Sequence, residues 1–148
     1  MKDFLTLENQ LCFALYETNS LFSKLYTQAL QPFKITYPQY LVLLVLWEED
    51  GQAIKQIGDR LNLGTGTLTP MIKRMENNGW IIKRKNPEDE RKVNIHLSEK
   101  AIEDKAEITA SIAKHIQACH INYEEYITVM NELNNLQEKL TKYVSSVS

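Results

Sequence analysis

The sequence predicts a mainly α-helical protein with a small β-wing, in which a winged helix-turn-helix part lies between N- and C-terminal dimerisation helices. One observation is the order helix, strand, polar turn and strand between residues 62 and 97. Another is a set of long apolar stripes at helical spacing near both ends of the chain. The length of 148 residues fits one domain, residues 1–148, with the winged part at about 36–97 and dimerisation helices at about 5–30 and 98–144.

The composition is that of an ordinary globular protein, with 43% apolar and 24% charged residues. No apolar run approaches the roughly 18 residues that a membrane span needs. The first residues lack the charged-then-apolar layout of a signal peptide. We therefore expect a cytoplasmic protein that does not interact with membranes.

The charge is divided unevenly along the chain. The whole chain carries a net charge of −2, which alone is unusual for a protein that binds DNA. Residues 65–92, however, hold seven basic and four acidic side chains, a local charge of +3. Positive charge is thus concentrated where the helix-strand pattern predicts contact with phosphates. A chance cluster on a solvated surface remains the alternative.

The first third of the chain predicts two helices. Apolar spacing and the absence of a helix breaker before Pro32 predict one long helix over about 5–30, which suggests an interface. Thr36 and Gln39 have the spacing of a capping box, and Pro38 falls in the first turn of the helix that they begin. This second helix runs through residue 47, and we expect it to be central and buried. Its predicted inner side comprises Tyr40, Leu41, Leu43, Leu44, Leu46 and Trp47.

The next stretch predicts the helix-turn-helix itself. Residues 54–61 form its first helix and residues 62–64 its turn, and Gly79 ends the recognition helix because glycine tolerates the left-handed conformation. Pro70 lies early in this helix, where it is tolerated. The predicted buried face comprises Leu68, Met71, Ile72 and Met75. The outer face carries Thr65, Thr67, Thr69, Lys73 and Arg74.

The C-terminal third predicts two further helices. Ser98 is the expected cap of a helix that runs to about His120, and Asn122 with Glu125 suggests a capping box for the last helix. The apolar spacing of the last helix fits a narrow packing seam. An intramolecular bundle is possible, but three long apolar stripes outside the winged part favour dimerisation.

The recognition helix and the wing carry side chains suited to DNA. The N-terminus of a helix offers unpaired N–H groups to phosphate, and the nearby threonines either contact DNA or act as plain capping residues. Lys73 and Arg74 suit phosphate and guanine, respectively, and Lys85 at the wing is a further DNA-binding candidate. Asp89 is close enough to Arg91 to brace its guanidinium, and a braced arginine at a wing tip suits the minor groove. A solvated surface pair is the alternative.

Cys12 and Cys119 are too far apart in the sequence to form a CxxC pair. In a cytoplasmic protein such cysteines are either buried packing residues or redox-active. With only three histidines and no clustered ligand spacing, we expect no metal site and no cofactor.

Several motifs resemble those of the MarR family of winged-helix repressors. These are Gly66-Thr-Leu-Thr-Pro-Met-Ile-Lys-Arg-Met-Glu, followed by Asp89-Glu-Arg91. Two more specific motifs, Leu7-Glu-Asn-Gln-Leu-Cys12-Phe and Ile35-Thr-Tyr37-Pro-Gln-Tyr40, resemble the organic hydroperoxide-sensing (OhrR-type) branch. The resemblance implies a homodimer that binds near-palindromic double-stranded operator DNA. It also implies that Cys12 senses peroxide and that Tyr26 and Tyr37 hydrogen-bond to it.

The resemblance has one departure and leaves alternatives open. Relatives usually carry aspartate and serine where this chain has Gly64 and Thr65, so operator preference transfers less well than the fold. Cys119 is either packing filler or the partner of oxidised Cys12 in an intersubunit disulfide, and a low-molecular-weight thiol is the other candidate partner. The alternative function is a MarR-type repressor released by a small phenolic or drug-like ligand. A thiol peroxidase is disfavoured, since no arginine lies beside Cys12 in the sequence to assist turnover, and we expect no enzymatic activity.

Overall fold

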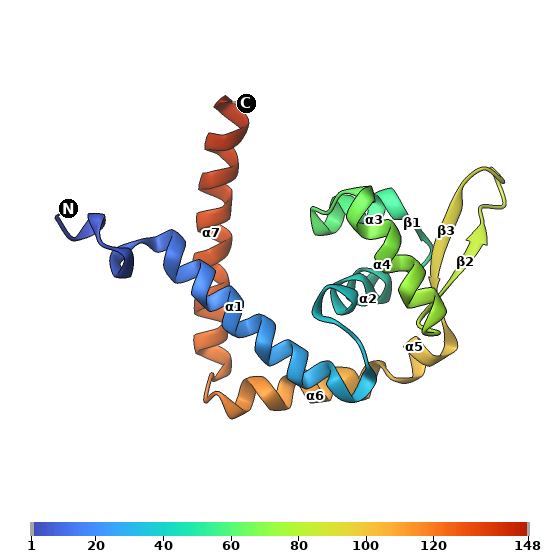
Figure 1. Ribbon diagram of the computed structural model, residues 1–148, viewed down its shortest axis with the longest axis horizontal. Helices are drawn as coiled ribbons and strands as arrows, with labels where there is room; N and C mark the ends of the chain where they lie inside the picture. The colour runs from blue at the N-terminus through green and yellow to red at the C-terminus, as the bar shows by residue number, and fades with distance from the viewer. Residues whose placement is uncertain (1, 148) are drawn as a thin grey trace. The chain divides into compact units, whose positions relative to one another are not determined.

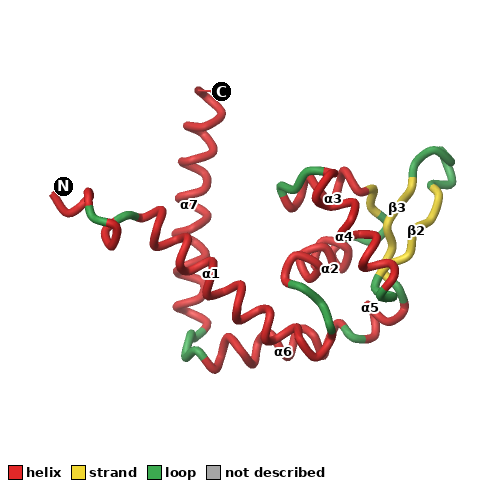
Figure 2. Tube along the Cα trace, viewed as in Figure 1, coloured by secondary structure: helices red, strands yellow, loops and turns green. Residues whose placement is uncertain are grey.

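The computed structural model describes residues 2–147, which are mainly helical with a small antiparallel sheet (Figures 1 and 2). This confirms the predicted fold class. The described residues form two compact units that divide between Ile112 and Ala113, within helix α6. The elements are η1 (Lys2–Leu5), η2 (Leu7–Asn9), α1 (Leu11–Leu30), η3 (Gln31–Phe33), α2 (Tyr37–Glu48), β1 (Gln52–Ala53), α3 (Ile54–Leu61), α4 (Thr65–Asn77), β2 (Ile81–Lys85), β3 (Val93–Leu97), α5 (Glu99–Glu103), α6 (Lys105–Ala118) and α7 (Tyr123–Val147).

The first long helix begins later than the apolar pattern predicted. Two short 3₁₀ helices precede it, and α1 starts at Leu11 rather than near Leu5. Gln10 is extended (φ −85°, ψ 121°), and its side-chain amide donates to the carbonyl of Phe4. The apolar spacing continues through this junction, but the extended backbone at Gln10 interrupts the helix. Cys12 therefore lies in the first turn of α1.

Helix α2 is the buried centre of the first unit. The predicted capping box is confirmed: the Gln39 backbone N–H donates to the Thr36 hydroxyl (3.3 Å), and the Thr36 N–H donates to the Gln39 side chain (3.2 Å). Val42 and Leu43 are fully buried. The predicted inner side was wrong at Leu44, which is 37% exposed, because one stripe of the helix is left uncovered.

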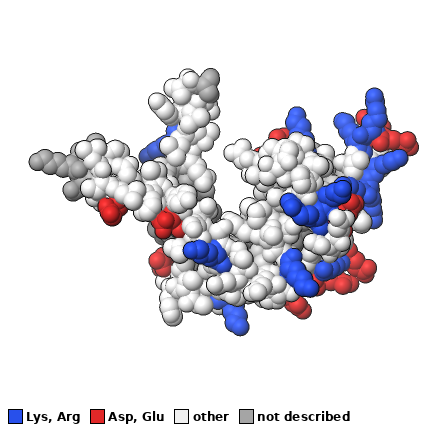
Figure 3. All heavy atoms as spheres, in the orientation of Figure 1, with Lys and Arg blue, Asp and Glu red and all other residues white. Residues whose placement is uncertain are grey.

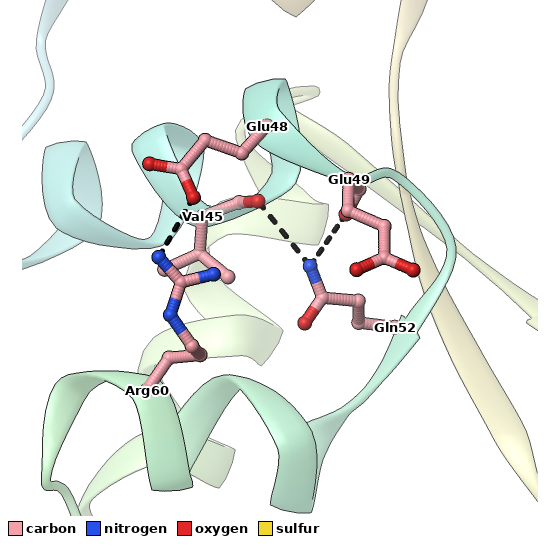
Figure 4. Close-up of polar contacts among 5 residues, drawn as sticks. All are labelled: Val45, Glu48, Glu49, Gln52 and Arg60. Atoms are coloured by element: carbon pink, nitrogen blue, oxygen red, sulfur yellow. Dashed lines mark hydrogen bonds and ion pairs between the residues drawn. The ribbon is translucent and has the colours of Figure 1, made fainter.

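Two polar contacts hold the junction between α2 and α3 (Figure 4). The Gln52 side chain is buried, and its amide donates to the carbonyls of Val45 (3.2 Å) and Glu49, at the C-terminal end of α2. The Val45 carbonyl also accepts from the Glu49 N–H (3.2 Å), so Gln52 adds a second donor there and supplies a donor to the Glu49 carbonyl just past the end of the helix. Arg60 of α3 forms an exposed ion pair with Glu48 of α2 (2.7 Å).

The helix-turn-helix depends on close backbone approach at Gly58. Asn62 adopts the left-handed conformation (φ 59°) at the end of α3, and the Leu63 N–H donates to the Gly58 carbonyl (2.9 Å). A Cβ at position 58 would lie 2.7 Å from the Leu63 carbonyl oxygen. Only glycine fits this turn without a shift of the backbone. The predicted bounds of α3 and its turn are confirmed.

Helix α4 ends as predicted, and the chain then enters the sheet. Gly79 is left-handed (φ 82°); its N–H donates to Glu76, and the Trp80 N–H donates to Met75, which is the Schellman pattern. Strand β2 pairs with β3 in antiparallel register, from Ile81 opposite Leu97 to Lys85 opposite Val93. The sheet order is β1-β3-β2.

Strand β1 and a break in the helix after β3 were not among the predicted elements. Strand β1 has only two residues and exists through its pairing with β3, so no local pattern announces it. Ser98 caps a helix as predicted, by accepting from the Ala101 N–H (3.2 Å). The predicted helix 98–120 is instead two helices, α5 and α6, which are separated at Asp104, where ψ opens to −4°. The Ser111 hydroxyl then ties α6 to the Ala29 carbonyl of α1 (2.7 Å).

The second unit is dominated by α7. The Asn122 side chain accepts from the Glu125 N–H (2.8 Å), as expected for a cap. All side chains of α7 are at least partly exposed within one chain, including Tyr126, Ile127 and Met130. An apolar helical stripe of this size suits a partner surface, so dimerisation remains the prediction for α7. Among residues 2–147, no helix is long and apolar enough to cross a membrane.

We predict that Gln52→Leu lowers the free energy of unfolding by about 1–3 kcal/mol, because the part-buried Glu49 carbonyl loses its amide donor and the Val45 carbonyl loses one of its two donors. Arg60→Ala is the matched control at the same junction. It removes an exposed ion pair and should cost less than about 1 kcal/mol. Denaturant unfolding of both variants measures the difference, and equal costs would contradict the role assigned to Gln52.

We also predict that Gly58→Ala destabilises the fold by about 1–3 kcal/mol, because the new methyl group meets backbone rather than a flexible side chain. Gly66→Ala is the control within the same motif. Nothing lies within 4 Å of its added Cβ, so this change should raise stability by up to about 1 kcal/mol through helix propensity. Thermal or denaturant unfolding should therefore move in opposite directions for the two variants.

Candidate nucleic-acid interface and redox cysteines

The N-terminus of α4 is exposed and has no side-chain cap. Gly64 occupies the cap position (φ −71°, ψ 155°) and offers no side-chain acceptor to the first turn. The Thr67 N–H (3.1 Å) and the Leu68 N–H (3.0 Å) bond instead to the Gly64 carbonyl. The earliest N–H groups of α4 have no capping acceptor and remain available to an anion such as a phosphate.

The two faces of α4 differ as the sequence predicted. Leu68, Met71, Ile72 and Met75 are buried against the rest of the unit. The residues on the outer face are all exposed: Thr65, Thr67, Thr69, Lys73 and Arg74. Two cations and three hydroxyl groups thus share one accessible surface.

The wing brings further cations to the same compact unit. Lys85 is exposed at the end of β2. The Arg91 Nε lies 3.3 Å from the Asp89 carboxylate, and the Arg91 side chain is 92% exposed, so the predicted brace is present. Figure 3 shows Lys and Arg gathered over α4 and the β2–β3 wing, with carboxylates at the wing tip.

Two neighbouring cations, Lys83 and Arg84, were not among the predicted DNA-binding residues. Arg84 is exposed between Lys83 and Lys85 on β2, and the basic run in the sequence was a sufficient signal to include it. Lys83 is partly engaged, because its ammonium lies 3.6 Å from the Glu76 carboxylate on α4. This pair links the wing to the recognition helix.

Both cysteines are free and exposed in the single chain. Cys12 lies in the first turn of α1, within the first unit. Cys119 follows α6 in the second unit, and its thiol donates to the His115 carbonyl (3.4 Å). Neither cysteine is therefore buried within its own chain. Among the described residues, no group of three or more His, Cys, Asp or Glu side chains is placed to hold a metal ion.

Tyr26 and Tyr37 lie together but far from Cys12 of the same chain. Their rings are stacked, with centroids 4.9 Å apart, and Tyr40 packs against Tyr26 at 5.8 Å. Cys12 and Tyr26 are both on α1, fourteen residues apart, which corresponds to roughly 21 Å along a helix. One chain therefore does not bring these tyrosines to its own Cys12.

Comparison with known proteins identifies the family. Residues 24–108 match the family model described as transcriptional regulator SarA/Rot. The chain belongs to the SarA/Rot and MarR-type family of winged-helix transcription regulators. This confirms the resemblance drawn from the sequence motifs, and its relatives are transcription regulators rather than enzymes.

Two curated relatives match part of the chain. The organic hydroperoxide resistance transcriptional regulator of Bacillus subtilis (strain 168) is 50% identical over 97 residues, which is 66% of this chain and 66% of the relative. The regulator TtmR of Methylorubrum extorquens (strain PA1) is 50% identical over 95 residues, which is 64% of this chain. The matched part spans about half of TtmR, 49% of its length.

Solved structures of AbfR, a protein of Staphylococcus epidermidis, match nearly the whole chain. Reduced AbfR bound to DNA is 37% identical, with a TM-score of 0.79 over 95% of this chain and 99% of that one. Disulfide-formed AbfR is 35% identical, with a TM-score of 0.67 over 91% of this chain and 95% of that one. The same fold is therefore known in a DNA-bound form and in a disulfide form.

Proposed function

We propose that this transcription regulator is a repressor that binds operator DNA as a homodimer and releases it when an organic hydroperoxide oxidises Cys12. The observation that carries the proposal is that one compact unit presents both a cation-bearing helix-and-wing surface and an exposed cysteine in the first turn of α1. The structure of reduced AbfR bound to DNA supports the DNA-binding part of the proposal. The name of the Bacillus subtilis relative, an organic hydroperoxide resistance transcriptional regulator, supports the hydroperoxide part.

On the DNA side, α4 supplies the reading surface. Its uncapped N–H groups and Lys73 suit phosphates, and Arg74 suits guanine in the major groove. Thr65, Thr67 and Thr69 supply hydroxyl and methyl groups to the same groove. On the wing, Arg91 braced by Asp89 suits the negative potential of the minor groove, and Lys85 suits the flanking phosphates.

On the sensing side, the proposal involves two chains. The tyrosine pair is roughly 21 Å from Cys12 of its own chain, so we propose that the partner subunit supplies the hydroxyl groups of its Tyr26 and Tyr37 to this sulfur. Hydroxyl groups that donate to sulfur favour the thiolate, which is the form that reacts with peroxide. The aromatic side chains around them also give the site an apolar wall, which suits an organic peroxide.

The proposed oxidation has two steps. The Cys12 thiolate attacks the terminal peroxide oxygen, an S–O bond forms as the O–O bond breaks, and the alkoxide takes a proton and leaves as an alcohol. The thiolate of the partner subunit's Cys119 then attacks the sulfenic sulfur, and hydroxide leaves as water when the disulfide forms. The exposure of Cys119 supports this pairing, as does the disulfide form of AbfR.

We predict that Lys73→Ala weakens binding to a duplex from the protein's own promoter and reduces the slope of log affinity against log salt by about 1, because one phosphate contact is lost. Fluorescence anisotropy across a series of salt concentrations measures both quantities. Lys142→Ala, a lysine of α7 in the second unit, is the charge-matched control. A Lys73 variant with the wild-type salt slope would remove α4 from the proposed interface.

We further predict that cumene hydroperoxide releases wild-type protein from this duplex and that Cys12→Ser stays bound, because serine forms no sulfenic acid. A gel shift with and without oxidant measures release. If Cys12→Ser dissociates as readily as wild type, the redox function is wrong.

Cys119→Ser serves as the control for the second step. It should still be oxidised at Cys12 but should fail to give the covalent dimer that wild type shows on a non-reducing gel. A covalent dimer that persists in Cys119→Ser would contradict the proposed pairing while leaving Cys12 as the sensor.

A further inference from the structure

The tip of the wing, residues 86–92, is closed by its own backbone. The Asn86 N–H donates to the Lys92 carbonyl (2.8 Å), and the Lys92 N–H donates to the Asp89 carbonyl (2.9 Å). The Asp89 N–H donates in turn to the Asn86 carbonyl (3.2 Å). The tip is therefore an ordered loop at the end of the β2–β3 pair.

Two side chains complete this loop in the same way. The Asn86 Oδ1 accepts from the Glu88 N–H (2.9 Å), and the Asp89 Oδ1 accepts from the Arg91 N–H (3.1 Å). Each is a side-chain turn in which an Asn or Asp bonds to the backbone two residues later. Asn86 and Asp89 are half-buried, whereas the side chains between and after them are exposed.

The order of charges makes the register of this loop important. Three acidic residues, Glu88, Asp89 and Glu90, precede the cations Arg91 and Lys92. A shift of one residue at the tip would present Glu90 where Arg91 now stands and would place a carboxylate against the phosphates. Like charges at such short range repel strongly, so the turn must hold its register for the wing to attract DNA.

We propose that Asn86 is a positioning residue for DNA recognition, whose side-chain turn sets the register in which Asp89 presents the Arg91 guanidinium. The inference rests on the proposed DNA-binding function and extends it to a residue whose proposed role is to order the loop. Asn86 orders the loop by accepting from the Glu88 N–H. Asp89 then accepts from Arg91, and in this proposal Arg91 makes the contact with DNA.

The chemistry of the position favours an amide. The amide oxygen of asparagine accepts from the Glu88 N–H without adding charge, whereas aspartate would place a fourth carboxylate at the tip. Alanine removes the acceptor altogether. Serine keeps an acceptor of the same kind, although hydroxyl turns are weaker.

The test is a double-mutant cycle between Asn86 and Arg91 on the promoter duplex. Asn86→Ala should weaken binding roughly two- to tenfold, the loss that one hydrogen bond typically produces. Asn86→Ser should recover most of this loss. In the Arg91→Ala background, the added Asn86→Ala change should alter affinity by less than about twofold, because the side chain that it positions is gone.

A second measurement needs no DNA. In ¹H–¹⁵N spectra of the free protein, Asn86→Ala should shift the backbone signals of Glu88 and Arg91 and the side-chain Nε signal of Arg91, and it should leave those of α4 in place. Unmoved Arg91 signals would overturn the positioning role.

The outcomes separate this inference from the function on which it rests. One contrary result is that Asn86→Ala lowers the affinity for DNA equally in the wild-type and Arg91→Ala backgrounds, and another is that it does not lower the affinity at all. Either result would overturn the inference and leave the proposed DNA-binding function intact. Wild-type affinity in Arg91→Ala would also overturn it and would remove the wing tip from the proposed interface. Failure of wild type to bind any duplex would overturn the proposed function itself.

Discussion

The burial of α2 is the constraint on which the first unit depends. Val42 and Leu43 are fully buried, and α3, α4 and β3 all contact this helix. The capping box at Thr36 provides hydrogen bonds at the N-terminal end of this helix, and the buried amide of Gln52 donates to carbonyls at its C-terminal end. Because Gln52 also belongs to β1, the residue that completes α2 fixes where the sheet and α3 begin.

Helix α2 also contacts both α1 and α5, and α5 in turn contacts the end of α4. Tyr40 packs against Tyr26 of α1 on one side and against Trp47 on the other, with centroids 5.8 and 6.2 Å apart. The Trp47 indole N–H donates to the Ala101 carbonyl of α5 (3.1 Å), and Ser98 at the start of α5 donates through its hydroxyl to the Gly79 carbonyl (2.7 Å). The end of the recognition helix is therefore joined to α1 through packed rings and hydrogen bonds.

Several features of the fold could be predicted from the sequence because their signal lies in residues close together in the chain. The cap at Thr36, the bounds of α3, the stop at Gly79 and the two faces of α4 each follow from residue types at short spacing, and each is present. The missed features depend on distant partners or on backbone geometry. Strand β1 exists through β3, the extended backbone at Gln10 interrupts an unbroken apolar pattern, and Asp104 separates two helices that one periodicity spans. For the candidate interface, the cations were visible in the sequence, but the turn at Asn86 appears only once the loop is closed.

The geometry of α1 relates the proposed sensor to the DNA-reading surface in physical terms. Cys12 is at its exposed end, whereas Ala29 and Leu30 at its other end are fully buried, and the Ala29 carbonyl accepts from Ser111. Helix α1 thus connects the exposed Cys12 to buried residues of the first unit. In a dimer whose partner tyrosines hold Cys12, loss of the thiolate would remove a bond at one end of this helix and disturb the rings packed on Tyr40 in the other subunit. Cores are close-packed and do not deform continuously, so such a disturbance would shift the unit between discrete arrangements. In the proposed dimer, the two copies of α4 would have to match the spacing of two operator half-sites, so a rotation of the DNA-binding parts relative to each other would weaken binding.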